Sequence, residues 1–154
     1  MNEYMTGAEL QALREACGLD RDQFGLLCGV QGRSIKYWEM GASNHGVPAD
    51  VAALVQELAD KVDAMAADAI ARHAGAADVV LMRTSDPIAN AVASRVYLAL
   101  RRRGKEVRLV AFDNKAYRAT LRGKDTPDAR QAWAVRALKD QAKPHRQDQP
   151  TPPR

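Results

Sequence analysis

The sequence has few cysteines, few aromatic residues and no long apolar run, and each shortage excludes a class of protein. Cys17 and Cys28 are the only cysteines among the 154 residues, and no Cys/His cluster has the spacing of a metal site, so we expect no bound metal or other cofactor. The two thiols instead indicate a reducing cytoplasm. No segment approaches the roughly 18 apolar residues of a membrane span. The first ten residues lack the basic and apolar regions of a secretory signal, so we predict a cytoplasmic protein with no membrane partner.

The composition favours helices, and its charge is unevenly distributed. Aromatic residues make up only 5% of the chain, while alanine dominates the apolar set and suits helices more than strands. The net charge of +4 divides into −2 over residues 1–47, −3 over 48–75 and +9 over 76–154. Because the basic excess lies in the C-terminal half, a nucleic-acid-binding surface elsewhere must be identified from local pattern rather than from total charge.

The start and stop signals of the chain predict a mostly α fold with a small α/β C-terminal part. Capping residues and apolar periodicity indicate helices at about 6–17, 20–29, 31–40, 48–74, 86–103 and 126–140, and strands at 78–83 and 107–112. A strand, a helix and a strand in succession suggest a βαβ unit or an equivalent small layer. We therefore expect an N-terminal bundle with a long connecting helix over residues 1–75 and a sheet-plus-helix dimerisation domain over 76–141. Residues 142–154 hold four of the seven prolines and are expected to be disordered.

The most informative stretch is DRDQFGLLCGVQGRSIKYWEMG, which runs from Asp20 to Gly41. It contains two short helices joined by a turn at Gly29, where glycine permits a left-handed conformation. Its apolar positions are expected to face one small core: Phe24, Leu27, Val30, Ile35 and Trp38. The polar residues between them fall mostly on the opposite face, and Glu39 is expected to pair within the bundle. A recognition helix for the DNA major groove needs this division into an anchored face and a free face.

These residues resemble the helix-turn-helix signature of the Cro/CI-type (XRE) repressors over about residues 5–60. The resemblance implies a lambda-repressor-like bundle of four or five helices that binds double-stranded operator DNA as a homodimer. The major-groove readers that it implies are Gln31, Gly32, Arg33, Lys36 and Tyr37, and the residues that it places at the DNA backbone are Arg21, Ser43, Asn44 and His45. Gly32 departs from the usual pattern, in which a side chain at that position reaches the bases. Arg33 is therefore the main candidate for a base contact. The layout of the whole chain is more loosely similar to YdiL-like and anti-CRISPR-associated repressors.

The long fourth helix carries a heptad-like seam in which apolar residues step by four and three. Four of these residues are candidates for a dimer contact: Val55, Leu58, Val62 and Met65. Alternatively, the same stripe packs within one chain, first on the N-terminal bundle and then on the C-terminal layer. The opposite side of the helix is acidic, which should keep it away from DNA.

The second half of the chain lacks a GxGxxG motif, a phosphate-binding loop and a paired acid/base constellation, so we predict no catalytic residues and no enzymatic activity. The loop Thr84-Ser85-Asp86 lies between a strand end and a helix start, where anions and small ligands often bind in α/β folds. Helix capping by Ser85 or Asp86 is the favoured interpretation of this loop. Arg101-Arg102-Arg103 and the basic residues after them form a solvated face or a surface for RNA.

The sequence thus predicts a homodimeric transcriptional regulator, a repressor of an inverted-repeat operator that could include its own promoter. Two alternatives remain at this point. The chain could be an antitoxin-type or other protein-interaction module that also binds DNA, or an RNA-binding protein that uses its basic C-terminal half.

Overall fold

The computed structural model describes residues 4–41 and 46–144, and these form seven helices and one small parallel sheet. The elements in chain order are α1 (Gly7–Ala16), α2 (Arg21–Cys28), α3 (Gly32–Glu39), α4 (Ala49–Arg72), β1 (Asp78–Arg83), α5 (Pro87–Arg102), β2 (Glu106–Ala111), α6 (Asn114–Thr120) and α7 (Pro127–Gln141). The prediction of a mostly helical protein with a small α/β part is confirmed. In the described part of the chain, no helix is long and apolar enough to cross a membrane.

The helix boundaries follow the capping signals of the sequence closely. Asp20 and Gln23 form the expected reciprocal capping box at the start of α2, and Gly29 leaves that helix with a φ of +72°. Asp86 caps α5 by accepting a hydrogen bond from the backbone N–H of Ile88. The fourth helix ends at Arg72, slightly before the expected end near residue 74. Helix α6 was not predicted, because its seven residues are too few to show a helical period.

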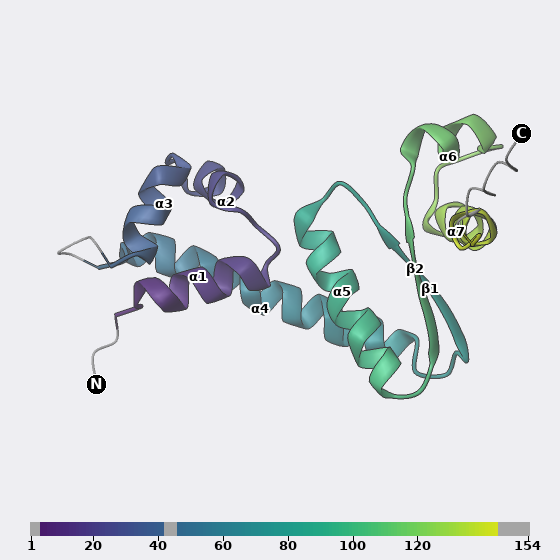
Figure 1. Ribbon diagram of the computed structural model, residues 1–154, viewed down its shortest axis with the longest axis horizontal. Coiled ribbons are helices and arrows are strands. Elements are labelled where there is room, and N and C mark those ends of the chain that lie inside the picture. The colour runs from purple at the N-terminus through teal and green to yellow at the C-terminus, as the bar shows by residue number, and fades with distance from the viewer. Residues whose placement is uncertain (1–3, 42–45, 145–154) are drawn as a thin grey trace, which may run out of the picture.

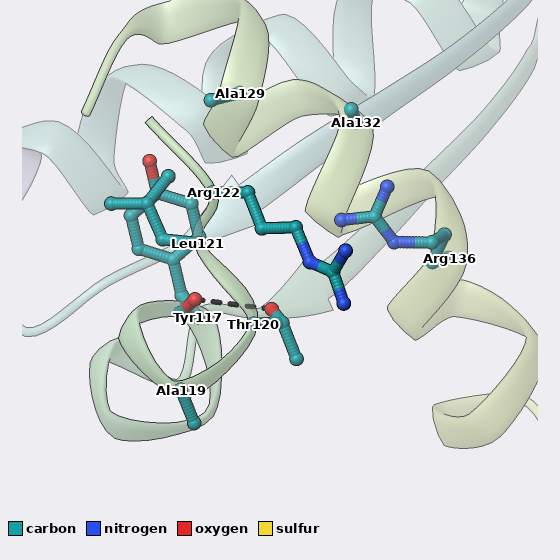
Figure 2. A pocket seen from close by; sticks show the side chains of 8 residues that line it. All are labelled: Tyr117, Ala119, Thr120, Leu121, Arg122, Ala129, Ala132 and Arg136. Atoms are coloured by element: carbon teal, nitrogen blue, oxygen red, sulfur yellow. Dashed lines mark hydrogen bonds between the residues drawn. The ribbon is translucent and has the colours of Figure 1, made fainter. Parts of the chain in front are cut away.

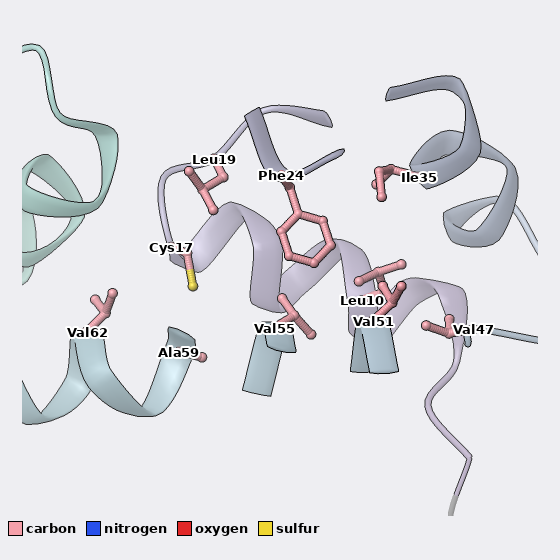
Figure 3. Packing of buried hydrophobic residues seen from close by; sticks show 10 residues of the cluster. All are labelled: Leu10, Cys17, Leu19, Phe24, Ile35, Val47, Val51, Val55, Ala59 and Val62. Atoms are coloured by element: carbon pink, nitrogen blue, oxygen red, sulfur yellow. The ribbon is translucent and has the colours of Figure 1, made fainter. Parts of the chain in front are cut away.

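The first four helices enclose an apolar core at one end of the molecule (Figure 1). Phe24 of α2 and Ile35 of α3 meet Leu10 of α1 and Val55 of α4, and all four side chains are fully buried (Figure 3). Trp38 and Val30 pack against this core as expected, with part of each side chain exposed. The prediction for Leu27 was wrong, because its side chain is 51% exposed. Helix α2 instead turns Phe24 and Gly25 inward, which rotates Leu27 toward solvent.

Most apolar residues of the α4 seam are buried within one chain. This corrects the prediction that the seam forms the dimer contact. Val55 and Val62 are completely buried in the N-terminal core, and Leu58 packs against it with partial exposure. Only Met65 among the four predicted residues is mostly free, with 52% of its surface exposed. The reason is that α4 lies under α1 on one stretch and against α5 on the next, so its apolar stripe already has partners.

Strands β1 and β2 are parallel neighbours, with Val79 opposite Val107 and Leu81 opposite Leu109, as a βαβ unit requires. Helix α5 covers one face of this sheet and α7 the other (Figure 1). Successive side chains of each strand point to opposite faces of the sheet. Val79 and Val107 therefore join the apolar cluster under α5, whereas Val80 and Val110 join the cluster under α7. Ile88 and Val92 of α5 also pack against the N-terminal core, so the two predicted domains share a packed boundary.

Helix α7 also reaches the two outer edges of the sheet. The side-chain amide of Gln141 bonds both the N–H and the C=O of Ala111 at 2.8 Å, at the edge of β2. Gln131 donates to the carbonyl of Val80 at 3.0 Å, at the edge of β1. These bonds engage part of each edge, where unpaired backbone groups would otherwise be available to another strand.

Candidate nucleic-acid interface

Helix α3 divides cleanly into an anchored face and a free face. Ile35 and Glu39 point into the bundle and are buried, whereas Arg33, Lys36 and Tyr37 are exposed on the other side. Among the described residues, Arg33 and Lys36 have no ion-pair partner. The structure thus brings these predicted groove readers together on one basic surface.

Gln31 extends this surface at the start of α3. It occupies the N-cap position and is exposed, but its side chain makes no capping hydrogen bond. Within residues 4–41 and 46–144, the Gln31 amide is thus not used to cap α3. A free glutamine amide is suited to bidentate pairing with the major-groove edge of adenine.

The far end of α3 is held by a buried cluster of charges. Arg14 of α1 donates through Nε and Nη2 to the two carboxylate oxygens of Glu39, and Arg21 of α2 donates to Glu39 Oε2 at 2.8 Å. The Glu39 side chain has no exposed surface. Burial disfavours its charged form, but the hydrogen bonds and charges of the two arginines outweigh burial and lower the pKa of Glu39 below its usual 4.5. Three helices are thereby tied together at one carboxylate.

This cluster confirms the expectation that Glu39 pairs within the bundle, and it changes the role of Arg21. Arg21 was expected to touch a DNA phosphate, but its Nε is engaged by Glu39 and only 36% of its side chain is exposed. Glu39 therefore holds the guanidinium through Nε, while part of the side chain stays exposed. The sequence could not show this, because Glu39 lies 18 residues further along the chain.

Gly32 is a packing residue, which corrects its assignment as a groove reader. It is buried, and a Cβ added at this position would lie 2.0 Å from Asp22 Oδ1 and 3.1 Å from the Asp22 backbone nitrogen. Gly25 is similar, because a Cβ there would lie 2.7 Å from the carbonyl oxygen of Val30. The two glycines let α2 and the start of α3 approach more closely than any side chain permits.

A shallow hollow of about 430 Å³ lies where α2 meets the start of α3. Asp22 and Leu26 form its α2 side, and Gln31 and Arg33 form its α3 side. Sequence reasoning missed Leu26, which is 82% exposed beside these polar groups. The exposed side chain of Leu26 adds apolar surface to this hollow. The mid-helix Gly25 was the available signal, since it marks the inward side of α2 and leaves Leu26 outside.

The remaining predicted backbone contacts, Ser43, Asn44 and His45, lie outside the described residues. Over residues 4–41 and 46–144, no group of three or more His, Cys, Asp or Glu side chains is arranged to hold a metal ion. Burial raises the pKa of the Cys17 thiol, even though the charge of Arg95 lowers it, and burial also raises the pKa of Cys28. Both thiols are therefore kept in the protonated, unreactive form at neutral pH.

Comparisons with protein families and with curated proteins found no match to this chain.

Proposed function

We propose that the chain is a sequence-specific DNA-binding transcriptional regulator, a homodimeric repressor whose α2 and α3 form a helix-turn-helix of the lambda-repressor-like type. The observation that carries this proposal is the basic outer face of α3 on a helix whose inner face is fixed by Ile35 and Glu39. A groove reader must hold its donors at a defined angle, and a rigidly anchored helix does so without further ordering.

The exposed residues have distinct roles in this proposal. Arg33, in the first turn of α3, donates to a guanine edge, and Gln31 pairs with an adenine. Lys36, one turn further along, neutralises a phosphate. Tyr37 and Leu26 provide apolar surface at the margins of the contact. Asp22 is exposed beside Arg33, and its carboxylate would repel nearby DNA phosphates. This repulsion favours binding sites in which the carboxylate accepts a hydrogen bond from a cytosine amino group.

Two copies are needed because one α3 offers few base contacts. We propose a homodimer that reads an inverted repeat, with a contact that does not use Val55 or Val62, since both are buried within each protomer. Met65 is the residue of the α4 seam that remains accessible for such a contact.

The experiment is selection of bound sequences from a random pool of DNA duplexes, followed by sedimentation of the protein alone and on the selected site. We expect an enriched inverted repeat whose half-sites lie about 10 base pairs apart or a multiple of that distance. We also expect two copies of the chain per site. A pool without enrichment, or a single copy on a site without symmetry, would contradict the proposal.

A further inference from the structure

A groove of about 810 Å³ lies between α6 and α7, at the end of the molecule far from α3 (Figure 1). Its apolar floor includes Leu121, Ala129 and Ala132, and Tyr117 also lines it although its side chain is almost fully buried. Two exposed cationic side chains, Arg122 and Arg136, line the same groove. Its volume falls in the range of about 300–1,000 Å³ typical of small-molecule sites. The groove shares no lining residue with the candidate interface on α3.

The segment that carries Arg122 is fixed on both sides. Tyr117 is buried and donates its phenolic O–H to Asp125 Oδ1 at 2.7 Å. Arg130 of α7 donates two hydrogen bonds to the same carboxylate, from Nε at 2.8 Å and from Nη2 at 2.7 Å. Asp125 thus links α6 to α7 across the loop, so the groove exists before any ligand arrives.

The same contacts leave the groove without a negative charge. The hydrogen bonds from Arg130 and Tyr117 lower the pKa of Asp125 and keep it ionised, but its charge is already engaged by Arg130. In the described part of the chain, neither Arg122 nor Arg136 forms an ion pair. Figure 2 shows the side chains of Arg122 and Arg136 directed toward one another. Two like charges that face each other with no carboxylate between them favour an external anion.

We propose that this groove binds a small phosphate monoester, with the phosphate between Arg122 and Arg136 and a flat apolar group on the floor. Two guanidinium groups offer more N–H donors and more charge than one carboxylate can satisfy. A phosphate monoester has three free oxygens and close to two negative charges at neutral pH, which match two arginines. A phosphodiester in a nucleic-acid backbone has a single charge and two free oxygens, so it matches the pair less well.

The test uses the full-length protein and phenyl phosphate, titrated calorimetrically at pH 7.5. We expect saturable binding that weakens at least tenfold in Arg122→Ala and in Arg136→Ala. Arg102→Ala is the matched control, since Arg102 is exposed at the end of α5 and outside the groove, and its binding should stay within twofold of the parent. Benzenesulfonate, which keeps the ring but has one charge, should bind at least tenfold more weakly than phenyl phosphate.

Circular dichroism of each variant serves as the folding control. Absence of saturable binding, unchanged binding in both groove variants, or an equal loss in Arg102→Ala would overturn the proposal. So would equal affinity for benzenesulfonate and phenyl phosphate, because the site would then be unselective for a dianion. Loss of duplex DNA binding in the groove variants without any binding of phenyl phosphate would instead assign the groove to a nucleic-acid backbone. The titrations with phenyl phosphate and benzenesulfonate are independent of the α3 surface, so a failure of this proposal is distinguishable from a failure of the proposed DNA binding.

Discussion

Arg14 and Glu39 lie 25 residues apart in the sequence and form a buried ion pair that joins α1 to the end of α3. The guanidinium of Arg14 also donates to the carbonyl of Leu19 at 2.7 Å, so it supports the turn before α2 as well. The direction in which α3 presents Arg33 and Lys36 therefore depends on residues that never face the proposed DNA. This relationship connects the stability of the bundle with the geometry of its exposed surface.

Replacement of Glu39 by Gln should strongly destabilise the fold. The change leaves the Arg14 guanidinium, whose side chain is only 7% exposed, with only the more distant and exposed carboxylate of Glu15, 3.7 Å away, as a countercharge. Removal of one member of a buried ion pair costs about 3–5 kcal/mol. Urea unfolding measures the loss. Glu57→Gln is the control, because Glu57 pairs with Lys61 on the exposed side of α4, where such a pair is worth about 0.5 kcal/mol or less. Similar losses in the two variants would contradict this account of the cluster.

Acid should lower the free energy of unfolding by protonating the Glu39 carboxylate. Because the pKa of Glu39 is lower in the folded chain than its usual 4.5, the unfolded chain binds the proton more readily. The stabilisation by Glu39 is therefore complete above about pH 4.5 and is lost as the pH falls through the folded-state pKa. Urea unfolding of the parent and of Glu39→Gln at several pH values measures this. The difference between them should shrink below pH 4.5, and a constant difference down to pH 3 would disprove the linkage.

Gly25→Ala should destabilise the junction of α2 with α3. The added methyl group would lie 2.7 Å from the carbonyl oxygen of Val30, so the backbone must shift. We expect a loss of about 1–3 kcal/mol, as in overpacked cores, despite the better helix propensity of alanine. Gly75→Ala is the matched control, because a Cβ there meets nothing within 4 Å, and its stability should change by less than about 1 kcal/mol. Thermal melting compares the two, and equal melting temperatures would show that the close approach is unimportant.

Two residues of the α4 seam should behave differently in assembly and in folding. Val62 is fully buried, so Val62→Ala should lower the free energy of unfolding by about 1–3 kcal/mol and leave the dimer dissociation constant unchanged. Met65 is half-exposed, so Met65→Ala should leave the unfolding of the protomer unchanged and weaken the proposed dimer. Sedimentation equilibrium measures association, and urea unfolding measures stability. A weaker dimer in Val62→Ala alone would reverse the assignment.

Local signals of the sequence predicted most of the elements, because capping and periodicity depend on neighbouring residues. Two helix starts were indicated by capping residues, one by Asp20 with Gln23 and the other by Asp86 before Pro87. The run 78–83 has the apolar character of a strand. The partners of the α4 stripe could not be predicted in this way. A helical face that packs within one chain has the same period as one that packs against a second copy. Only the positions of α1 and α5 decided between these two possibilities.

The candidate interface was predictable where exposure follows from helical period, as for Arg33, Lys36 and Tyr37. The sequence failed where long-range contacts decide the role of a residue. Arg21 lies near the start of a helix like a phosphate ligand, yet Glu39 engages it. Gly32 has the spacing of a groove reader, yet Asp22 packs against its backbone. The groove between α6 and α7 could not be predicted, because α6 was missed and because Arg122 and Arg136 line the same groove only in the folded chain.

The central claim is that α3 reads DNA, and binding of Arg33→Ala to the selected duplex and to a scrambled duplex tests it most directly. Fluorescence anisotropy at several salt concentrations gives both affinities, and circular dichroism verifies the fold. We predict a loss of about 1–3 kcal/mol on the selected site and little change on the scrambled one, because a lost base contact removes specificity. Lys36→Ala should weaken both duplexes alike and reduce the salt slope by about one. Arg72→Ala, at the exposed end of α4, is the control and should bind as the parent does. A folded Arg33→Ala protein that binds the selected site as tightly as the parent would contradict the account.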